Sequence, residues 1–343
     1  MINLEHLTIN YGDNTVVKNL NFSLGHDEIL MLVGPTGCGK STILKAIAGL
    51  VPIADGKITN SHWVADAKHQ VPPEKRNLGM VFQDFALFPH LSVLDNVSFR
   101  LKTTKKAEHW LAVLGLSEFS QVKPSQLSGG QKQRVALART LAHEPALVLL
   151  DEPLSSLDAA LKDELRWQIR DALKAAGVPA IWVTHDQEEA LSIGDQVGVL
   201  RAGNLEQLAD PQTCYNTPAN EFVAGFLGDA NFLDGQLDSN NNNNNCVNTV
   251  LGSAAIHPNQ HSTNQVKVLL RPEDIDLQAN EQGNGKVIWS RFEGKSSLVL
   301  VELSDGEQIR VRQSNKVTLH TNQTVQLTIN TQAPLSVFPV TEK

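Results

Sequence analysis

The sequence has few cysteines and no long apolar run, and these two shortages narrow the class of protein. Its three cysteines, Cys38, Cys214 and Cys246, are odd in number and far apart, which argues against a disulfide framework and against zinc-type spacing. No apolar run approaches the roughly 20 residues that cross a bilayer. The start, MINLEHLTIN, lacks the basic residues and apolar centre of a secretory signal. We therefore expect a soluble chain in the cytoplasm.

Basic charge is also scarce. Lys and Arg number 29 against 37 Asp and Glu, which leaves a net charge of −8 at pH 7. This negative net charge argues against nonspecific binding of nucleic acid, so we expect no nucleic-acid partner. At 343 residues the chain is too long for one ordinary core, and we expect two or more domains.

Residues 1–228 have the pattern of an α/β domain. Runs rich in Val, Ile and Leu, such as EILMLVG and ALVLLD, alternate with helical patterns, as expected of a mostly parallel sheet with helices on its faces. The run DAALKDELRWQIRDALKAAG has apolar residues at four-residue intervals and ends at Gly177, which predicts an amphipathic helix. Residues from about 84 to 140 lack a strong strand signal, and we interpret them as a helical subdomain.

Residues 229–343 have a different sequence pattern. Short alternating runs such as QVKVLLR and SLVLVEL are separated by Gly, Asp and Asn turns, which predicts a second, all-β and barrel-like domain. Within it, residues 240–245 are an unbroken run of asparagine. A polar run of this kind cannot drive burial, so we expect a solvated loop and assign it no role.

The segment GPTGCGKST carries the strongest chemical signal. It follows a buried-strand pattern and precedes a helical one, which is the context that a phosphate-binding loop requires. Its glycines would let backbone N–H groups surround a phosphate, while Lys40 would reach the β- and γ-phosphates and Ser41 would ligate Mg²⁺. A thiolate is favoured near a helix start, but for Cys38 a small space-filling role is the simpler interpretation. The predicted nucleotide-binding residues of this loop are Gly34, Pro35, Thr36, Gly37, Cys38, Gly39, Lys40, Ser41 and Thr42.

Polar side chains that suit phosphoryl transfer follow other predicted strands. In ALVLLDEP, Asp151 would face the Mg²⁺ shell and Glu152 would orient or deprotonate the attacking water. In AIWVTHD, His185 ends a strand and could bond a γ-phosphate, although an isolated histidine is as often a capping or core residue. Gln83 in GMVFQD could reach Mg²⁺ or the water, and Tyr11 could stack on a base. Either side chain, taken alone, could also be ordinary surface.

A second helix start that suits a phosphate occurs in LSGGQKQRVALARTL. Ser128, Gly129 and Gly130 precede a periodic helix, so their free N–H groups would lie at the positive end of the helix dipole. The phosphate-binding loop already supplies one such place. The residues alone do not explain why one chain has two helix starts that suit a phosphate.

The motifs GPTGCGKST, VFQ, LSGGQ, LVLLDEP, SSLD and VTHD occur in this order across residues 34–186, and the set resembles the ATP-binding subunit of ABC transporters. The resemblance implies an active ATPase with ATP and Mg²⁺ as cofactors. It implies that Gln83 senses the γ-phosphate and Mg²⁺ and that Asp151 supports the metal. It also implies that Glu152 is the general base and His185 the switch histidine.

The resemblance also implies a purpose for the second helix start, because this family forms its ATP sites between two chains in a head-to-tail homodimer. The residues that would close over ATP on the partner's phosphate-binding loop are Ser128, Gly129, Gly130 and Gln131. Asp158 would lie at the contact between the two subunits, and Tyr11 would stack on adenine. Two small departures, Thr140 where the family usually has Ala and Ser156 where Asn or Ala is common, remove no phosphate contact.

A narrower resemblance points to import. The run PPEKRNLGMVFQDFALFPHLSVLDNVSF is similar to the importer branch that serves polyamines, sugars, sulfate and ferric ion, and LLRPEDI is similar to its β-barrel regulatory domain. GDANFLDGQL most resembles the domain junction of ferric-ion import ATPases. Ferric ion is thus the expected solute, with polyamine, sulfate, sugar or phosphonate as alternatives. The resemblance implies a peripheral protein at the cytoplasmic face of the inner membrane, which drives integral membrane permease subunits and is linked indirectly to a periplasmic solute-binding protein.

Two other functions share part of this pattern. A soluble ABC ATPase that remodels ribosomes or DNA-repair complexes would have the same cassette, but such proteins typically carry tandem cassettes, coiled coils or basic arms. A metabolic kinase with a phosphate-binding loop would not account for LSGGQ. We therefore rank both below the importer subunit.

Overall fold

The structure is a computed structural model that describes the chain except for residues 156, 239–245, 259–263, 315–318 and 341–343. Ser156 and the asparagine run at 240–245 therefore lie outside the described residues. The chain divides into two compact units, Met1–Pro211 and Gln212–Lys343, and each is described by itself. None of the helices in the described part of the chain is both long enough and apolar enough to cross a membrane.

The centre of the first unit is a six-stranded sheet in the order β10-β9-β3-β8-β7-β6. Its strands are β3 (Ile29–Val33), β6 (Leu78–Val81), β7 (Leu147–Asp151), β8 (Ala180–Thr184), β9 (Gln196–Arg201) and β10 (Asn204–Ala209). All neighbours pair in parallel except β9 and β10. Every residue of β3 and β8 is buried, as their unbroken apolar sequences predict. The carboxyl ends of β3, β8, β7 and β6 therefore meet at one edge of the sheet.

A smaller antiparallel sheet in the order β2-β1-β4-β5 completes the strands of this unit. Its members are β1 (Ile2–Tyr11), β2 (Asn14–Leu24), β4 (Asp55–Asn60) and β5 (Trp63–Asp66). Helix α1 (Lys40–Ala48) packs against β1 and β2 on one side and against β7 and β8 on the other. One hydrophobic cluster contains residues of both sheets and of α1. Burial of this shared core fixes the start of α1 beside the edge of the central sheet.

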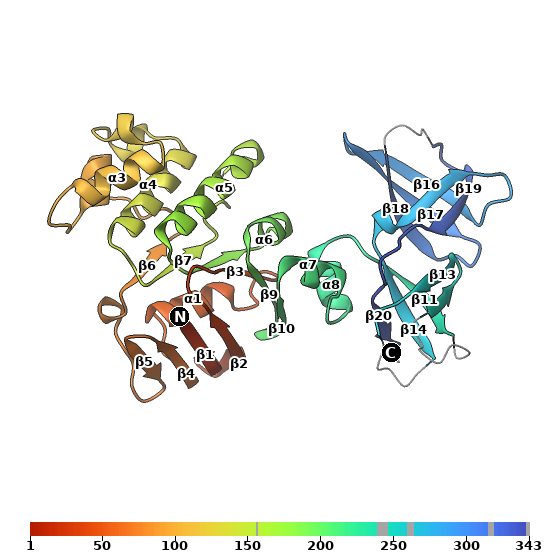
Figure 1. Ribbon diagram of the computed structural model, residues 1–343, viewed down its shortest axis with the longest axis horizontal. Helices are drawn as coiled ribbons and strands as arrows, with labels where there is room; N and C mark the ends of the chain where they lie inside the picture. The colour runs from red at the N-terminus through yellow and green to blue at the C-terminus, as the bar shows by residue number, and fades with distance from the viewer. Residues whose placement is uncertain (156, 239–245, 259–263, 315–318, 341–343) are drawn as a thin grey trace. The chain divides into compact units, whose positions relative to one another are not determined.

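The other described helices of the first unit follow β5 in the chain. They are α2 (Val93–Ser98), α3 (Lys105–Val113), α4 (Gly129–Ala142), α5 (Ala159–Ala176) and α6 (Gln187–Ile193), with short 3₁₀ turns at Pro73–Lys75, Ser117–Phe119 and Pro124–Gln126. Helices α2, α3 and α4 pack against one another. In Figure 1, α3 and α4 lie on the opposite side of the central sheet from β1, β2, β4 and β5. The helices between residues 84 and 140 therefore gather on one side of this unit.

The second unit contains two antiparallel sheets, in the orders β13-β12-β11-β14-β20 and β15-β19-β16-β17-β18. The first has β11 (Asn231–Leu237), β12 (Cys246–Thr249), β13 (Gly252–Ala255), β14 (Gln265–Leu270) and β20 (Val337–Pro339); the second has β15 (Ile275–Ala279), β16 (Gly285–Phe292), β17 (Ser296–Leu303), β18 (Gln308–Ser314) and β19 (Thr324–Ile329). Inward-facing residues of both sheets form one hydrophobic core. Two short helices, α7 (Pro211–Asn216) and α8 (Glu221–Leu227), precede these strands.

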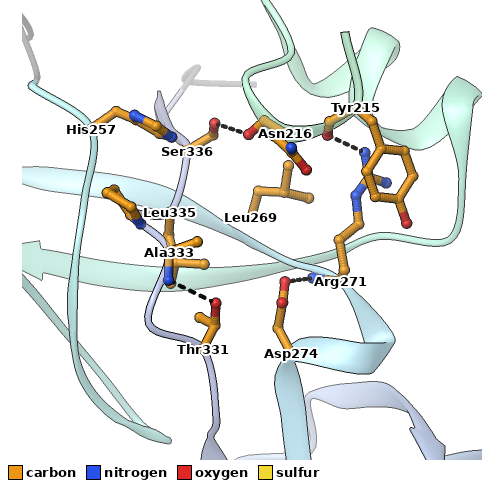
Figure 2. Close-up of a pocket in the computed structure, with 11 residues that line it drawn as sticks. Tyr215, Asn216, His257, Leu269, Arg271, Asp274, Thr331, Ala333, Leu335 and Ser336 are labelled. Atoms are coloured by element: carbon orange, nitrogen blue, oxygen red, sulfur yellow. Dashed lines mark hydrogen bonds between the residues drawn. The ribbon is translucent and has the colours of Figure 1, made fainter. Parts of the chain in front are cut away.

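A buried arginine ties the two short helices to the sheets. Arg271, only 5% exposed, follows β14, and its Nη1 donates to the carbonyl oxygens of Ala224 at 2.8 Å, Gly228 at 3.2 Å and Asp229 at 3.1 Å. Its Nη2 donates to the Tyr215 carbonyl at 3.0 Å, and the guanidinium lies 4.0 Å from the centre of the Tyr215 ring. Figure 2 shows this arginine at the wall of a cavity of about 210 Å³. These bonds make α7 and α8 part of the second unit, which begins at residue 212 rather than at the change of sequence texture near residue 228.

Candidate functional site

The loop after β3 has the backbone that a phosphate-binding loop needs. At Gly34 a Cβ atom would lie 2.3 Å from the carbonyl oxygen of Leu200, so only glycine fits there. Gly37 has open space around it but a φ of +82°, which is unfavourable for any residue with a side chain. Glycine at both positions, required by close packing at Gly34 and by the positive φ at Gly37, lets the chain turn from a buried strand into the start of α1.

Lys40, the first residue of α1, is folded over the loop. Its side chain is 6% exposed, and Nζ donates to the carbonyl oxygens of Gly34 at 2.7 Å and Pro35 at 3.1 Å. The Cys38 sulfur lies 4.0 Å from the same Nζ. Burial raises the pKa of the Cys38 thiol, although the nearby ammonium opposes this shift. The Cys38 thiol is therefore a buried neutral group, and the Lys40 ammonium is held against the carbonyl groups at the start of the loop.

Two side-chain pairs join this loop to the neighbouring strand ends. The Ser41 hydroxyl donates to Asp151 Oδ1 at 2.8 Å, across the gap between α1 and the end of β7. Glu152, the next residue, has its N–H bonded to the Val183 carbonyl of β8 at 3.0 Å. Its Oε2 lies 3.2 Å from Nδ1 of His185. The structure thus brings four of the predicted residues into two contacting pairs.

Gln83 and Tyr11 are not in contact with these pairs. Gln83 is exposed in the loop after β6, which ends at the same sheet edge. Tyr11 is 48% exposed at the last position of β1. Among the described residues, no hydrogen bond or ion pair joins either side chain to the loop after β3. Both side chains are exposed, and their predicted contacts with a nucleotide stay predictions.

The residues Ser128 to Gln131 form a reciprocal cap at the start of α4. The Ser128 hydroxyl accepts the N–H of Gln131 at 3.3 Å, and Oε1 of Gln131 accepts the N–H of Ser128 at 2.9 Å. Asp158 is exposed and occupies the N-cap position of α5, where its side chain makes no capping hydrogen bond. In the part of the chain that the structure describes, no hydrogen bond joins these residues to those between 34 and 42. Ser128 is exposed at this helix start, whereas Gly130 is buried.

Three glycines near α4 have packing roles that the motif pattern does not indicate. A Cβ on Gly129 would lie 2.7 Å from the Leu157 side chain, and one on Gly130 would lie 2.8 Å from that of Leu165. The glycines of this motif thus let α4 approach α5 and the residue Leu157 just before it. Near the C-terminal end of α4, a Cβ on Gly79 would lie 2.3 Å from the methyl group of Thr140. Only the folded structure reveals these partners, because they lie far away in the sequence.

A strand–loop–helix phosphate cradle, with a hydroxyl–carboxylate pair and a carboxylate–imidazole pair at adjacent ends of a parallel sheet, defines a P-loop nucleoside triphosphatase. Residues 17–155 match the ABC transporter family, and residues 268–335 match the TOBE domain. The Fe(3+) ions import ATP-binding protein FbpC of Fusobacterium nucleatum is 37% identical over 331 residues, which cover 92% of this chain and 87% of the relative. The spermidine/putrescine import ATP-binding protein PotA of Marinobacter nauticus is 38% identical, with coverages of 90% and 86%. The chain belongs to the ABC transporter family, as an ATP-binding subunit of the importer type, and it is an ATPase.

Solved structures agree with the fold of the first unit. The dimeric, post-hydrolysis structure of the ATP-binding cassette MJ0796 bound to ADP and Pi matches with a TM-score of 0.54 and 30% identity, over 62% of this chain and 99% of that one. CbiO1 from Clostridium perfringens matches with a TM-score of 0.57 and 29% identity, over 62% and 88%. With the TOBE match, these findings confirm the predicted α/β P-loop cassette followed by an all-β domain.

Proposed function

We propose that the chain binds Mg²⁺ with ATP on the loop at residues 34–42 and hydrolyses it with Glu152 as general base. The observation that carries this proposal is the pair of contacts at adjacent strand ends, from Ser41 to Asp151 at 2.8 Å and from Glu152 to His185 at 3.2 Å. When phosphate oxygens arrive, Lys40 exchanges its two carbonyl partners for them. His185 then orients Glu152 and reaches the γ-phosphate.

The oxygen atoms near Ser41 suit Mg²⁺. A hydroxyl and a carboxylate are hard donors of the kind this ion prefers, and it usually keeps several water ligands besides. Gln83 is exposed at the end of the next strand and would add an amide oxygen. Bound Mg²⁺ would supply charge neutralisation of the phosphates, while Asp151 and Ser41 hold its position.

We further propose that two copies of the chain share their ATP sites. Among the described residues, the Ser128 hydroxyl proton and the N–H groups of Gly129 and Gly130 take no part in the reciprocal cap. The cassette MJ0796 is dimeric with ADP and Pi bound, which supports a shared site here. In this arrangement Ser128 to Gln131 close over the partner's nucleotide, Asp158 lies at the subunit contact, and Tyr11 stacks on adenine.

For transport, we propose that the homodimer sits at the cytoplasmic face of the membrane and drives separate permease subunits, which receive solute from a periplasmic binding protein. Ferric ion is the proposed solute because GDANFLDGQL resembles ferric-ion ATPases and FbpC is among the relatives. Polyamine is the second candidate, since PotA is equally similar. Uptake of labelled ferric ion and of labelled spermidine, compared between cells with and without this chain, distinguishes the two.

The replacement Glu152→Gln tests the catalytic assignment. The amide keeps the size of the side chain but cannot take a proton, so ATP turnover should fall at least about 100-fold while ATP binding persists. Steady-state hydrolysis and equilibrium ATP binding, measured on purified protein, separate the two effects. Glu118→Gln, at an exposed carboxylate of another surface, is the matched control and should turn over normally. Turnover at the wild-type rate in Glu152→Gln would remove Glu152 from the mechanism.

A further inference from the structure

The loop that carries Gln83 contains two residues with a strained backbone. Phe85 and Ala86 have φ values of +65° and +46°, in the left-handed region that residues with a side chain rarely adopt. Strain of this kind persists only where the surrounding structure holds it. The Phe85 N–H bonds to the Phe82 carbonyl at 3.0 Å, which closes a turn around Gln83 and Asp84. The strained pair therefore ends and follows the turn that presents Gln83.

An arginine of α4 holds this strained pair. Nη1 of Arg139 donates to the Ala86 carbonyl at 2.8 Å, and Nη2 donates to the Phe85 carbonyl at 3.2 Å. Because the guanidinium is a planar fork, one side chain fixes both residues that have a positive φ. The guanidinium also lies 5.6 Å from the centre of the Phe88 ring. Burial lowers the pKa of Arg139, as expected of a cation that is partly withdrawn from water.

The far end of the loop has a separate anchor. The buried Asn96 of α2 accepts the N–H of Phe88 at 2.8 Å and donates to its carbonyl at 3.1 Å. Among the described residues, Arg139 is the only side chain that hydrogen-bonds to the backbone of residues 82–87. The conformation of the stretch that carries Gln83 therefore depends on Arg139, whereas the stretch that begins at Phe88 depends on Asn96.

The position of Gln83 is set by its backbone. Val81, the last residue of β6, pairs in parallel with Leu150 of β7, so Gln83 lies two residues beyond this pair, as Glu152 does on the neighbouring strand. The Gln83 side chain is exposed, and in the described part of the chain it forms no hydrogen bond. Whether its amide oxygen stays at the sheet edge is therefore decided by the turn and by the strained pair that follows it.

We propose that Arg139 is a positioning residue for ATP hydrolysis: its fork holds Phe85 and Ala86 in the left-handed conformation and so keeps Gln83 at the sheet edge, toward the proposed Mg²⁺ and the attacking water. The proposal rests on the proposed role of Gln83. Loss of the fork lets the loop relax to an ordinary backbone conformation and withdraws Gln83, while the phosphate-binding loop is untouched.

Arg139→Met is the decisive variant, since it keeps an apolar stem and removes both donors. We expect kcat to fall about tenfold, because a small misplacement of a catalytic group has effects of this size or larger, with KM for ATP within about twofold. The Mg²⁺ concentration for half-maximal turnover should rise, since Gln83 would no longer add its amide oxygen. An unchanged Mg²⁺ requirement would overturn the proposal, whatever happens to kcat.

Arg134→Met is the matched control on the same helix. Nη1 of Arg134 also donates to a loop carbonyl, that of Leu114, at 3.2 Å, but this loop does not carry Gln83. Its kcat and Mg²⁺ requirement should stay within about twofold of the wild type, even if its melting temperature falls as far as that of Arg139→Met. Equal changes of the Mg²⁺ requirement in both variants would mean that general damage to α4 is the cause, and would refute the role of Arg139.

Hydrogen exchange tests the same contact without any turnover. In the nucleotide-free protein, peptides that contain the Phe85 N–H should exchange faster in Arg139→Met than in the wild type, because the turn that this group closes has lost its support. Peptides from residues 34–42 should exchange alike in both proteins, and Arg134→Met should leave residues 82–87 unchanged. Wild-type exchange of residues 82–87 in Arg139→Met would contradict the proposal.

Arg139→Lys supplies a second route if Arg139→Met folds poorly. Lysine keeps the charge but cannot hold two carbonyl groups in a fixed geometry, so kcat should again fall. Adding Ala86→Gly should restore part of it, because glycine adopts a positive φ without steric cost and Ala86 is exposed. No recovery in the double variant would show that backbone strain is not what the arginine opposes.

Gln83→Ala separates the role of Arg139 from the proposed function. Combining it with Arg139→Met should add little to either single loss, since both act through Gln83, and fully multiplicative losses would overturn the link between them. If Gln83→Ala alone retains wild-type kcat and Mg²⁺ requirement, the proposed function of Gln83 fails. A loss in Gln83→Ala with a normal Arg139→Met refutes only the role of Arg139.

Discussion

Thr140 and Gly79 fit each other where α4 packs on β6. Thr140 is buried and its hydroxyl bonds to the Ala136 carbonyl at 2.9 Å, while its methyl group occupies the space in which a Cβ of residue 79 would lie. The threonine, which departs from the usual alanine of the family, is thus accommodated by the glycine. It lies inside the core and touches no proposed phosphate contact.

Replacing Gly79 with alanine should therefore overpack this contact. We expect Gly79→Ala to lower the free energy of unfolding by about 1–3 kcal/mol, and the double variant Gly79→Ala/Thr140→Ala to recover most of the loss. Urea denaturation of both variants measures this directly. Gly225→Ala, in a helix with open space around the site, is the control and should not destabilise. Equal stability of the single and double variants would show that the methyl group is not the obstacle.

At single residues, the sequence predicted what the chemistry of the motif requires and missed what distant packing requires. Ser41, Asp151, Glu152 and His185 could be placed together because parallel strands bring their carboxyl ends to one edge. Arg139 could not be singled out, since its partners are loop carbonyl groups 53 and 54 residues earlier in the chain. Arg134 and Arg139 belong to the same helical pattern, and only the fold separates them.

At the scale of elements, Arg271 holds α7 and α8 to the sheets of the second unit. Arg271→Met keeps the apolar stem but removes the donors to four carbonyl groups, so the local stability of residues 211–228 should fall by about 3 kcal/mol. Hydrogen exchange of peptides from this segment measures the change. Arg310→Met is the control, because that side chain is 51% exposed and pairs at 3.4 Å with Asp229, a surface pair of small value. Unchanged exchange in Arg271→Met would show that other contacts hold the helices.

The order of elements was predictable, whereas their assignment to units was less so. The buried central strands and the long helix that ends before Gly177 follow from apolar runs and periodicity, whereas the antiparallel sheet β2-β1-β4-β5 was not predicted. The short helices α7 and α8 have a helical sequence pattern like that of the first unit. Their carbonyl groups nevertheless accept hydrogen bonds from Arg271, which lies beyond residue 228. A long-range hydrogen bond of this kind produces no periodic pattern in the sequence. For this reason the domain boundary expected at residue 228 differs from the observed division after residue 211.

For the whole molecule, all proposed nucleotide contacts precede residue 211. A chain that ends there should therefore fold and bind ATP with an affinity within a few-fold of the full chain, and any loss should concern regulation or dimerisation. Binding of a fluorescent ATP analogue, alongside circular dichroism, tests this. Lys40→Ala in the same shortened chain is the control for specific binding. A folded fragment that does not bind ATP would refute the division of labour between the two units.

The shared-site proposal predicts how lesions combine in a dimer. If one subunit carries Lys40→Ala and its partner Ser128→Arg, both lesions fall in one composite site and the other site traps ATP. If one subunit carries both changes, each site has a lesion and trapping should fall. Tagged heterodimers assayed for trapped nucleotide distinguish the two arrangements. More trapping when both changes share a subunit would mean that each chain completes its own site.

A matched control for that experiment replaces Ser128→Arg with Ser92→Arg. Ser92 also caps a helix, where its hydroxyl oxygen accepts the N–H of Asp95 at 3.1 Å, but it belongs to no proposed nucleotide contact. Trapping should then be the same in both arrangements. A difference with Ser92→Arg would attribute the effect to helix damage.

The reciprocal bonds between Ser128 and Gln131 have a consequence for how two chains would meet. The serine oxygen accepts the N–H of Gln131 at 3.3 Å, so the side chain is oriented by the helix that it caps while its own proton takes no part in that bond. A loose serine would have to give up its rotational freedom at the moment of contact, and that entropy would weaken association. Here folding has oriented the serine side chain in advance, so in the proposed dimer a nucleotide held by the partner chain would meet a helix start that is already ordered.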